Sequence, residues 1–177
     1  MKKTFCRFPV SVFITGLLVI FMASCSPKPV ADESIIESNW VKRKAGPGHE
    51  LATIVESFYL PVYSQIYSQS EHRTHDLTVT VSIRNTSETD MIYLSRADYF
   101  DTSGSLIKSY CESTVFLKPL ETVAIVINED DKMGGTGGNF LFKTKSNANV
   151  STPVFEAVMI STSGQQGLSF TTRELQI

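Results

Sequence analysis

The sequence predicts an all-β fold, an antiparallel β-sandwich of about seven to eight strands. Three observations favour it. Runs rich in aromatic and β-branched residues recur along most of the chain, turn signals separate them about every ten residues, and no run of helical period exceeds two turns. The 177 residues suffice for one ordinary domain with a real core, and no tandem repeat is present.

The first 24 residues predict a signal peptide. Lys2, Lys3 and Arg7 give a positive start, and the apolar run Val10–Met22 follows. A membrane-spanning helix takes roughly 20 residues, so this shorter run indicates the core of a signal that is removed from the mature protein.

The end of this signal, Met22-Ala23-Ser24-Cys25, resembles the lipobox of bacterial lipoproteins. The resemblance implies cleavage before Cys25 and a diacylglyceryl thioether on its sulfur, and no other cofactor is expected. Some Gram-negative lipoproteins carry an aspartate at the next position, which retains them at the inner membrane. Ser26 therefore implies the periplasmic side of the outer membrane, if there is one. The alternative is an ordinary secretory peptide that is cleaved nearby.

Charge argues against one class of partner. Residues 1–24 hold three basic side chains, so the exported part has 13 basic and 18 acidic residues, a net charge of −5. Its longest basic cluster is Lys42-Arg43-Lys44, whereas a nucleic-acid partner requires a concentrated basic face. We expect the membrane, through the lipid anchor, and an envelope protein as partners. The basic triplet is either a solvated linker or a weak aid to lipid binding, at roughly 1 kcal/mol per residue.

Residues 25–50 are predicted to be a flexible tether, and residues 51–177 to be the β-sandwich domain. Prolines, glycines and scattered charges in the tether disfavour a packed core. Within it, Ile36 and Trp40 share one side of a short amphipathic segment. Trp40 either lies at the lipid interface, where such rings are enriched, or docks on the folded domain.

The first predicted strands show different patterns. Glu50–Ser57 has helical spacing over one or two turns. Phe58–Tyr67 is predicted to be an edge strand, because Pro61 cannot donate to a β-ladder. Asp76–Asn85 is the clearest element, since its apolar residues alternate with polar ones as in a half-buried strand. The polar run "NTSETD" at its end is a turn.

Strands and turns alternate through the second half. Asp101–Gly104 is predicted to be a tight hairpin turn, with glycine where φ is positive. The loop Thr162–Gly167 precedes the last strand. The further strands are predicted at Met91–Phe100, Ser105–Phe116, Thr122–Asn128, Asn139–Lys145, Thr152–Ser161 and Leu168–Leu175.

This succession resembles the immunoglobulin-like sandwiches of many exported modules, without their Cys–Trp–Cys core. The region from Tyr59 onward also resembles a family of exported bacterial proteins known only as a domain of unknown function. That resemblance implies an envelope location and no particular activity. The residues that carry it are Tyr59–Tyr67, Asp76–Thr86, Asp98–Gly104, Gly134–Phe140 and Glu156–Arg173.

The glycine-rich stretch "MGGTGGNF" fails three tests for a ligand loop. No lysine follows Gly138, as a phosphate loop requires, and Phe140 stands where a dinucleotide loop has its third glycine. The stretch is close to the calcium nonapeptide, with Asn139 in place of aspartate, but such sites form between repeats and one copy is present. We predict a hairpin connection whose backbone requires positive φ.

A ligand site is nevertheless predicted if the loops Gly134–Asn139 and Thr162–Gly167 lie at the same end of the sandwich. Their backbone N–H groups and amide side chains would then line a neutral polar site for a peptide terminus, a sugar or a glycan strand. The alternative is two solvated turns. The candidate binding residues are Gly134, Gly135, Gly137, Asn139, Gln165, Gln166 and Ser169.

Two further groups favour structural roles. His72 and His75 provide two ligands where zinc takes three or four, so we expect exposed histidines and no metal. Cys111 is the one cysteine left after Cys6 departs with the signal and Cys25 takes lipid. We expect Cys111 to be a small buried apolar residue near a strand end rather than a nucleophile.

Tyr59, Tyr63 and Tyr67 share one face if their strand is unbroken. They form either an exposed aromatic stripe for sugars or a partner, or part of the core at the sandwich edge, which we favour.

The sequence thus predicts a lipid-anchored cell-envelope protein without enzymatic activity, since no hydrolase motif is found. Its domain is expected to bind or scaffold another envelope protein through an edge strand or a loop end. The alternative is binding of a carbohydrate or small ligand through Gly134–Asn139 and Thr162–Gly167.

Overall fold

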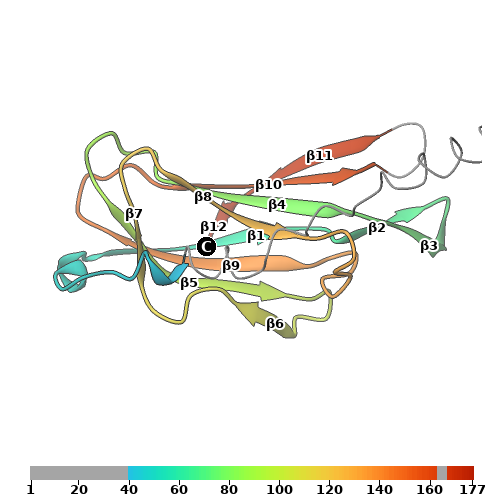
Figure 1. The fold of residues 1–177 in the computed structure, drawn as a ribbon, viewed down its shortest axis with the longest axis horizontal. Helices are drawn as coiled ribbons and strands as arrows, with labels where there is room; N and C mark the ends of the chain where they lie inside the picture. Colours follow the sequence, from blue (N-terminus) through green and yellow to red (C-terminus); the bar gives the residue numbers. More distant parts are fainter. Residues whose placement is uncertain (1–39, 163–166) are drawn as a thin grey trace, which may run out of the picture. The chain divides into compact units, whose positions relative to one another are not determined.

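The computed structural model describes residues 40–162 and 167–177. The regular elements of these residues are almost all antiparallel strands, arranged as two facing sheets and a hairpin (Figure 1). The predicted all-β sandwich is therefore confirmed. The structure has more strands than the prediction, because two predicted strands are interrupted and two further strands, Ser70–Asp76 and Leu175–Gln176, lie almost wholly outside the predicted ones.

The larger sheet has six strands in the order β12, β1, β9, β5 and β6, with β7 also paired to β5. The 3-10 turn η2 (His49–Leu51) precedes β1. The strands of this sheet are β1 (Ile54–Pro61), β5 (Ile92–Phe100), β6 (Leu106–Ser109), β7 (Val115–Leu117), β9 (Asn139–Ser146) and β12 (Leu175–Gln176).

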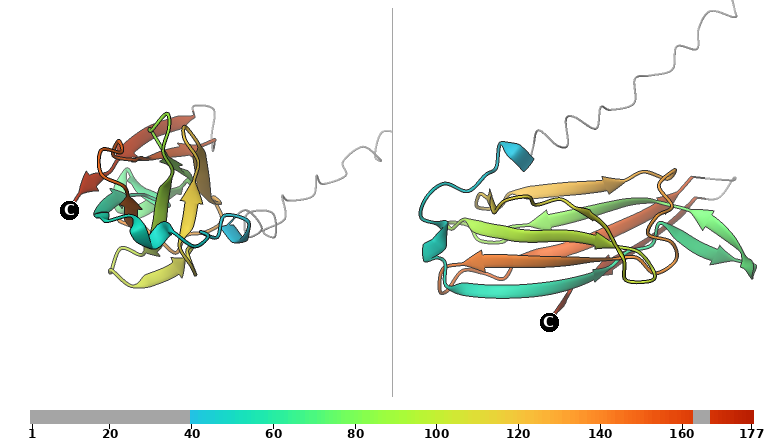
Figure 2. Two further views of the ribbon diagram at one scale, coloured as in Figure 1. Left: turned by 90° about the vertical axis from the view of Figure 1, so that its left-hand side faces the viewer. Right: turned by 90° about the horizontal axis from the view of Figure 1, so that it is seen from below.

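The smaller sheet has four strands in the order β11, β10, β4 and β8. They are β4 (Thr78–Arg84), β8 (Thr122–Ile127), β10 (Val154–Ser161) and β11 (Leu168–Arg173). A separate hairpin joins β2 (Gln65–Ser68) to β3 (Ser70–Asp76). It projects beyond the ends of the neighbouring strands in both Figure 1 and Figure 2.

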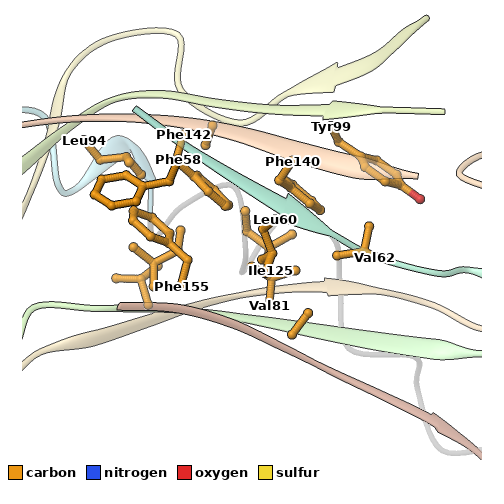
Figure 3. Packing of buried hydrophobic residues seen from close by; sticks show 14 of the residues in the cluster. Phe58, Leu60, Val62, Val81, Leu94, Tyr99, Ile125, Phe140, Phe142 and Phe155 are labelled. Atoms are coloured by element: carbon orange, nitrogen blue, oxygen red, sulfur yellow. The ribbon is translucent and has the colours of Figure 1, made fainter. Parts of the chain in front are cut away.

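The core lies between the two sheets and is dominated by phenylalanines. Phe142 stacks on Phe155 with ring centroids 4.3 Å apart, and Phe58 meets Phe155 at 4.9 Å (Figure 3). Each such ring contributes roughly 1.5–3 kcal/mol when fully buried. The predicted alternation in β4 is confirmed, because its apolar side chains face the phenylalanines and are fully buried.

Three predicted elements differ in the structure. Glu50–Ser57 is not a helix but η2 followed by the start of β1. β1 is not an edge strand, because it lies between β9 and β12. Its proline is tolerated since β12 pairs with only Phe58 and Tyr59, so that ladder ends before Pro61. The predicted strand Ser105–Phe116 is divided into β6 and β7.

Of the two placements left open for Trp40, the structure shows docking. Trp40 is 8% exposed, belongs to the core cluster, and lies 6.3 Å from the Tyr110 ring. Lys44 forms a bridge with Val115 of β7, and the Arg43 guanidinium lies 2.7 Å from the Glu121 carboxylate. Residues 40–45 therefore pack on the domain, ahead of the predicted boundary at residue 51.

Candidate functional site

The glycine-rich connection, residues 128–138, is a crossover between sheets. It leaves β8 in the four-stranded sheet and enters β9 in the six-stranded sheet. The prediction of a hairpin was therefore wrong, because β8 and β9 do not pair with each other. We call these residues the glycine loop. Positive φ occurs in it at Gly135 (64°) rather than throughout.

Hydrogen bonds tie the glycine loop to two other connections. The Thr102 hydroxyl, in the β5–β6 turn, donates to the Gly134 carbonyl at 2.9 Å and accepts from the Gly137 N–H at 3.0 Å. The N–H groups of Val62 and Gln65, which flank the β1–β2 connection, donate to carbonyls of the loop. The Gly135 N–H donates to the Lys132 carbonyl at 3.0 Å. Several of the loop's backbone groups thus serve bonds within the protein.

The glycines allow the loop to approach β5 closely. A Cβ at Gly134 would overlap the Tyr99 hydroxyl, and one at Gly138 would meet the Phe100 carbonyl at 3.2 Å. The Tyr99 hydroxyl lies at the end of the phenylalanine stack, pointing away from Phe140 (Figure 3). It is buried against Ser64 and Gly134 without a hydrogen bond of good geometry. Burial raises the pKa of Tyr99 to about 12.

An ion pair fixes the acidic side of the glycine loop to the β2–β3 hairpin. The Lys132 ammonium lies 2.7 Å from the Asp76 carboxylate, which also accepts a 2.8 Å hydrogen bond from Gln65. These two contacts, Lys132 first, lower the pKa of Asp76, and the same carboxylate raises the pKa of Lys132. Lys132 was not singled out from the sequence. Its position directly after the acidic residues 129–131 was the signal that could have identified it.

The strands that lead into the two predicted ligand loops, β8 and β10, end at the same end of the sandwich. β8 and β10 are both antiparallel to β4, so Ile127 at the end of β8 and Ile160 next to the end of β10 both pair with its first residues. β4 lies between them, which places the strand ends about 10 Å apart. Asn139 opens β9 opposite Pro61, and Ser169 is exposed on β11.

Gln165 and Gln166 lie outside the described residues. The N–H groups of Gly135 and Gly137 donate to the Lys132 carbonyl and the Thr102 hydroxyl, and the Gly134 carbonyl accepts from the same hydroxyl, so these three backbone groups already have partners within the protein. Cys25 also lies outside the described residues, and its acylation stays a prediction.

The tyrosine and histidine predictions have different outcomes. The tyrosines do not form one stripe, since the strand breaks after Pro61; Tyr63 packs against Phe170 at 5.9 Å, whereas Tyr67 is 61% exposed. His72 and His75 lie on β3 rather than on a loop. Within residues 40–162 and 167–177, no group of three or more His, Cys, Asp or Glu side chains is placed to hold a metal ion.

Cys111 is a free thiol that packs against the core. Burial, and to a smaller degree the charge of Asp98, raises its pKa to about 12. A raised pKa keeps the sulfur protonated, which is the opposite of what a nucleophilic cysteine requires.

The β8 strand presents an open edge. Within the described part of the chain, its only strand partner is β4, and no backbone hydrogen bond from a loop reaches its other side. Its six residues, "TVAIVI", contain no charge and no proline, and they pair with β4 without a register shift. Thr122, Ala124 and Val126 are exposed on its outer face. We call the side of β8 away from β4 the β8 edge.

The other sheet edges carry the features that block pairing. β12 has two residues, and β6 has a register shift and a lysine. β11 ends in Arg173, and its Thr172 hydroxyl donates to the Pro61 carbonyl at 2.6 Å, linking it to the six-stranded sheet. The side of β7 is partly covered by the bridge between Lys44 and Val115. The β8 edge differs from all of these, and the uncharged run "TVAIVI" was its signal in the sequence.

No helix within the described ranges is long and apolar enough to cross a membrane. A family model described as "Protein of unknown function (DUF3124)" matches residues 55–177. No curated protein matches the chain. Among solved structures, one described as "Crystal Structure of Thermotoga maritima 1070" is similar, with 10% identity and a TM-score of 0.43, over 68% of this chain and 92% of that chain.

Proposed function

We propose that this chain, which belongs to the DUF3124 family, is a lipid-anchored protein of the cell envelope whose domain binds an extended segment of another envelope protein. The segment pairs along the β8 edge and extends the four-stranded sheet by one strand. The domain acts by binding or scaffolding and catalyses no reaction.

The observation that carries this proposal is the edge of β8, along which no described residue forms a backbone hydrogen bond on the side away from β4. An edge strand leaves alternate backbone N–H and C=O groups unpaired, and folded proteins normally block such a row with charges, prolines, bulges or short strands. β8 has none of these features within six residues. An edge kept in this condition favours strand addition by a partner.

The side chains of β8 indicate what the partner segment is like. Thr122, Ala124 and Val126 face solvent, while Val123, Ile125 and Ile127 face the core. A paired segment places its own side chains beside these two rows, and β-branched and aromatic residues make favourable cross-strand pairs there. The expected partner segment is therefore an uncharged strand of about six residues, rich in Val, Ile, Thr or aromatic side chains.

The proposed anchor at Cys25 fits a partner at the membrane. Fourteen residues separate Cys25 from Trp40, the first described residue. A fully extended chain of this length reaches about 50 Å. Tethering confines the domain to a layer next to the membrane that is no thicker than this reach. The confinement raises the effective concentration of the β8 edge for membrane-associated partners. By the resemblance of the lipobox, the layer is the periplasmic side of the outer membrane in a Gram-negative cell.

Site-specific photo-crosslinking in cells tests the proposal. A photoreactive amino acid replaces Ala124 on β8 or, as a matched control, Thr171, which is exposed on the opposite edge strand β11. We expect a discrete adduct with one envelope protein from position 124 and none from position 171. Equal adducts from both positions, or none from position 124 in a folded chain, would contradict the proposal.

A further inference from the structure

We infer that the outer face of the six-stranded sheet, around Lys143 and Lys145, rests on the anionic surface of the bilayer. This inference depends on the proposed anchor, which holds the domain within reach of lipid headgroups. The β8 edge belongs to the other sheet, so it stays free for a protein partner.

The strand register places the two lysines in the middle of this face. Both lie on β9, which has β1 on one side and β5 on the other, as Figure 2 shows from below. Lys145 pairs with Val55 and Tyr93, while Lys143 pairs with Ser57 and Arg96. Residues two apart on a strand point the same way, so the two ammonium groups extend from one face, about 7 Å apart along the strand.

The two ammonium groups have no counterion within the described residues, whereas the neighbouring arginine has one. The Arg96 guanidinium contacts the Asp98 carboxylate at 2.5 Å and lies 5.8 Å from the Phe100 ring centroid. No ion pair involves Lys143 or Lys145 in residues 40–162 and 167–177. Like charges directly opposite each other in a sheet are destabilising, so Lys143 beside Arg96 favours an external anion.

Carboxylates close to the lysines do not neutralise them. Glu56 belongs to the opposite row of β1, where it pairs with the buried Thr144 and accepts a 3.0 Å hydrogen bond from Gln176. Glu50 lies in η2, outside the sheet. Asp98 is already bound to Arg96. The face therefore presents positive charge, although the exported chain as a whole is negative.

Apolar side chains beside the lysines distinguish a bilayer from a soluble anion. Leu51 is 78% exposed and Val55 53%, and both stand where η2 leads into β1, with Val55 paired directly to Lys145. Tyr93, in the row of Lys145, lies 6.0 Å from the His49 ring. Exposed aliphatic residues, a tyrosine and free lysines in one patch are the combination that binds the headgroup and acyl boundary.

The expected gain in membrane affinity from the two lysines suits a second contact rather than an anchor. Each lysine near an anionic membrane surface raises affinity about fivefold, so two raise it about 30-fold. This is too weak for stable attachment alone. Next to a covalent lipid, it is enough to hold the domain in one orientation.

The test uses the full chain as isolated from membranes, reconstituted on vesicles of two compositions: phosphatidylcholine alone, and phosphatidylcholine with phosphatidylglycerol at 7:3. Each lysine is labelled with an amine-reactive reagent, and its labelling rate is measured by peptide mass spectrometry. The internal control is Lys132, which is paired with Asp76 in the glycine loop. We expect the rates of Lys143 and Lys145 to fall at least fivefold on the anionic vesicles, with Lys132 unchanged, and to recover in high salt.

Equal rates for Lys143 and Lys145 on the two vesicles would overturn the inference and would point to another anion, such as an acidic glycan or an acidic protein. The mass of the N-terminal peptide separately shows whether Cys25 is acylated, and crosslinking at Ala124 separately tests the β8 edge. A failure of this inference is therefore distinguishable from a failure of the proposed function.

Discussion

The glycine loop and the β8 edge adjoin each other in the chain and use their backbone polar groups in opposite ways. The loop's N–H and C=O groups bond to Thr102, Lys132 and the β1–β2 connection. Within the described residues, the groups on the β8 edge have no such partners. The loop looks like a binding element in the sequence, yet several of its backbone groups are bonded within the protein, while β8 looks like an ordinary strand and has an open edge among the described residues.

The difference shows that glycine content alone does not identify a ligand loop. Glycine serves here for close approach, since Gly134 packs against Tyr99 and Gly138 against the Phe100 carbonyl. Whether a backbone N–H or C=O group is free to bind a partner depends largely on neighbours that are remote in sequence. These neighbours differ between the glycine loop and the β8 edge. From this contrast we expect effects on the free energy of unfolding that decrease from the glycine loop to the β8 edge.

The largest effect is expected for Gly134→Ala. The added Cβ overlaps the Tyr99 hydroxyl, so the loop or the ring must move. Overpacking of this kind costs about 1–3 kcal/mol, and we expect a value near 3 kcal/mol from urea unfolding. Gly46→Ala is the matched control, because nothing lies within 4 Å of its Cβ position. Equal stability of the two variants would show that the loop is not packed as described.

The second-largest effect is expected from alkaline pH, which should destabilise the folded state through the buried Tyr99 hydroxyl. Burial raises the pKa of Tyr99 to about 12, above its unfolded value of about 10. The folded state therefore retains a proton that the unfolded state releases, and stability falls as the pH rises from 10 to 12. The Cys111 thiol, with its pKa raised to about 12, adds a similar loss of stability at alkaline pH. The effect of Tyr99 should therefore be measured in a chain that carries Cys111→Ala.

In that background, Tyr99→Phe should remove the alkaline loss, as followed by unfolding at pH 9 and pH 11. At neutral pH, the same substitution should change stability little, since the hydroxyl has no well-formed hydrogen bond. An undiminished alkaline loss in Tyr99→Phe would place the titrating group elsewhere.

A smaller effect is expected for Thr102→Val. It removes the hydroxyl that bonds both Gly134 and Gly137 while keeping the side chain's shape. Loss of these bonds should cost about 1–2 kcal/mol, measured by urea unfolding. Thr171→Val, at an exposed position of β11, should stay within about 0.5 kcal/mol. A Thr102 variant as stable as this control would mean that solvent replaces the bonds without loss.

The smallest effect on stability, and a large one on binding, is expected for Val126→Lys. Val126 is 39% exposed on the outer face of β8, so the free energy of unfolding should change by no more than about 0.5 kcal/mol. A charge on an open edge opposes strand pairing, and the crosslink from position 124 should fall at least tenfold. Thr171→Lys on β11 should leave that crosslink intact. An undiminished crosslink in Val126→Lys would exclude pairing at this edge.

Local pattern was sufficient to predict much of the fold. β4 follows from the alternation of Leu77, Val79, Val81 and Ile83, because half-burial imposes a period of two. The turn Asp101–Gly104 follows from its residues: Gly104 has φ 83°, and the Asp101 carboxylate accepts hydrogen bonds from the N–H groups of Ser103 and Ser105.

Features set by long-range partners could not be predicted. The glycine loop crosses between sheets because of which strands pair, and no residue within it specifies that choice. The docking of Trp40 depends on Tyr110, 70 residues later in the chain. The candidate site changed for the same reason: an open edge is a property of a whole sheet, whereas the glycine motif could be judged from eight residues.

Residue-resolved amide hydrogen exchange on the purified full chain tests the central contrast most directly. We expect slow exchange at Gly135 and Gly137. Along β8, we expect slow exchange at amides bonded to β4 and fast exchange at the alternate amides on the β8 edge, which become protected when the crosslinked partner is added. Uniform protection of β8 in the isolated chain, or fast exchange at both glycines, would contradict this contrast.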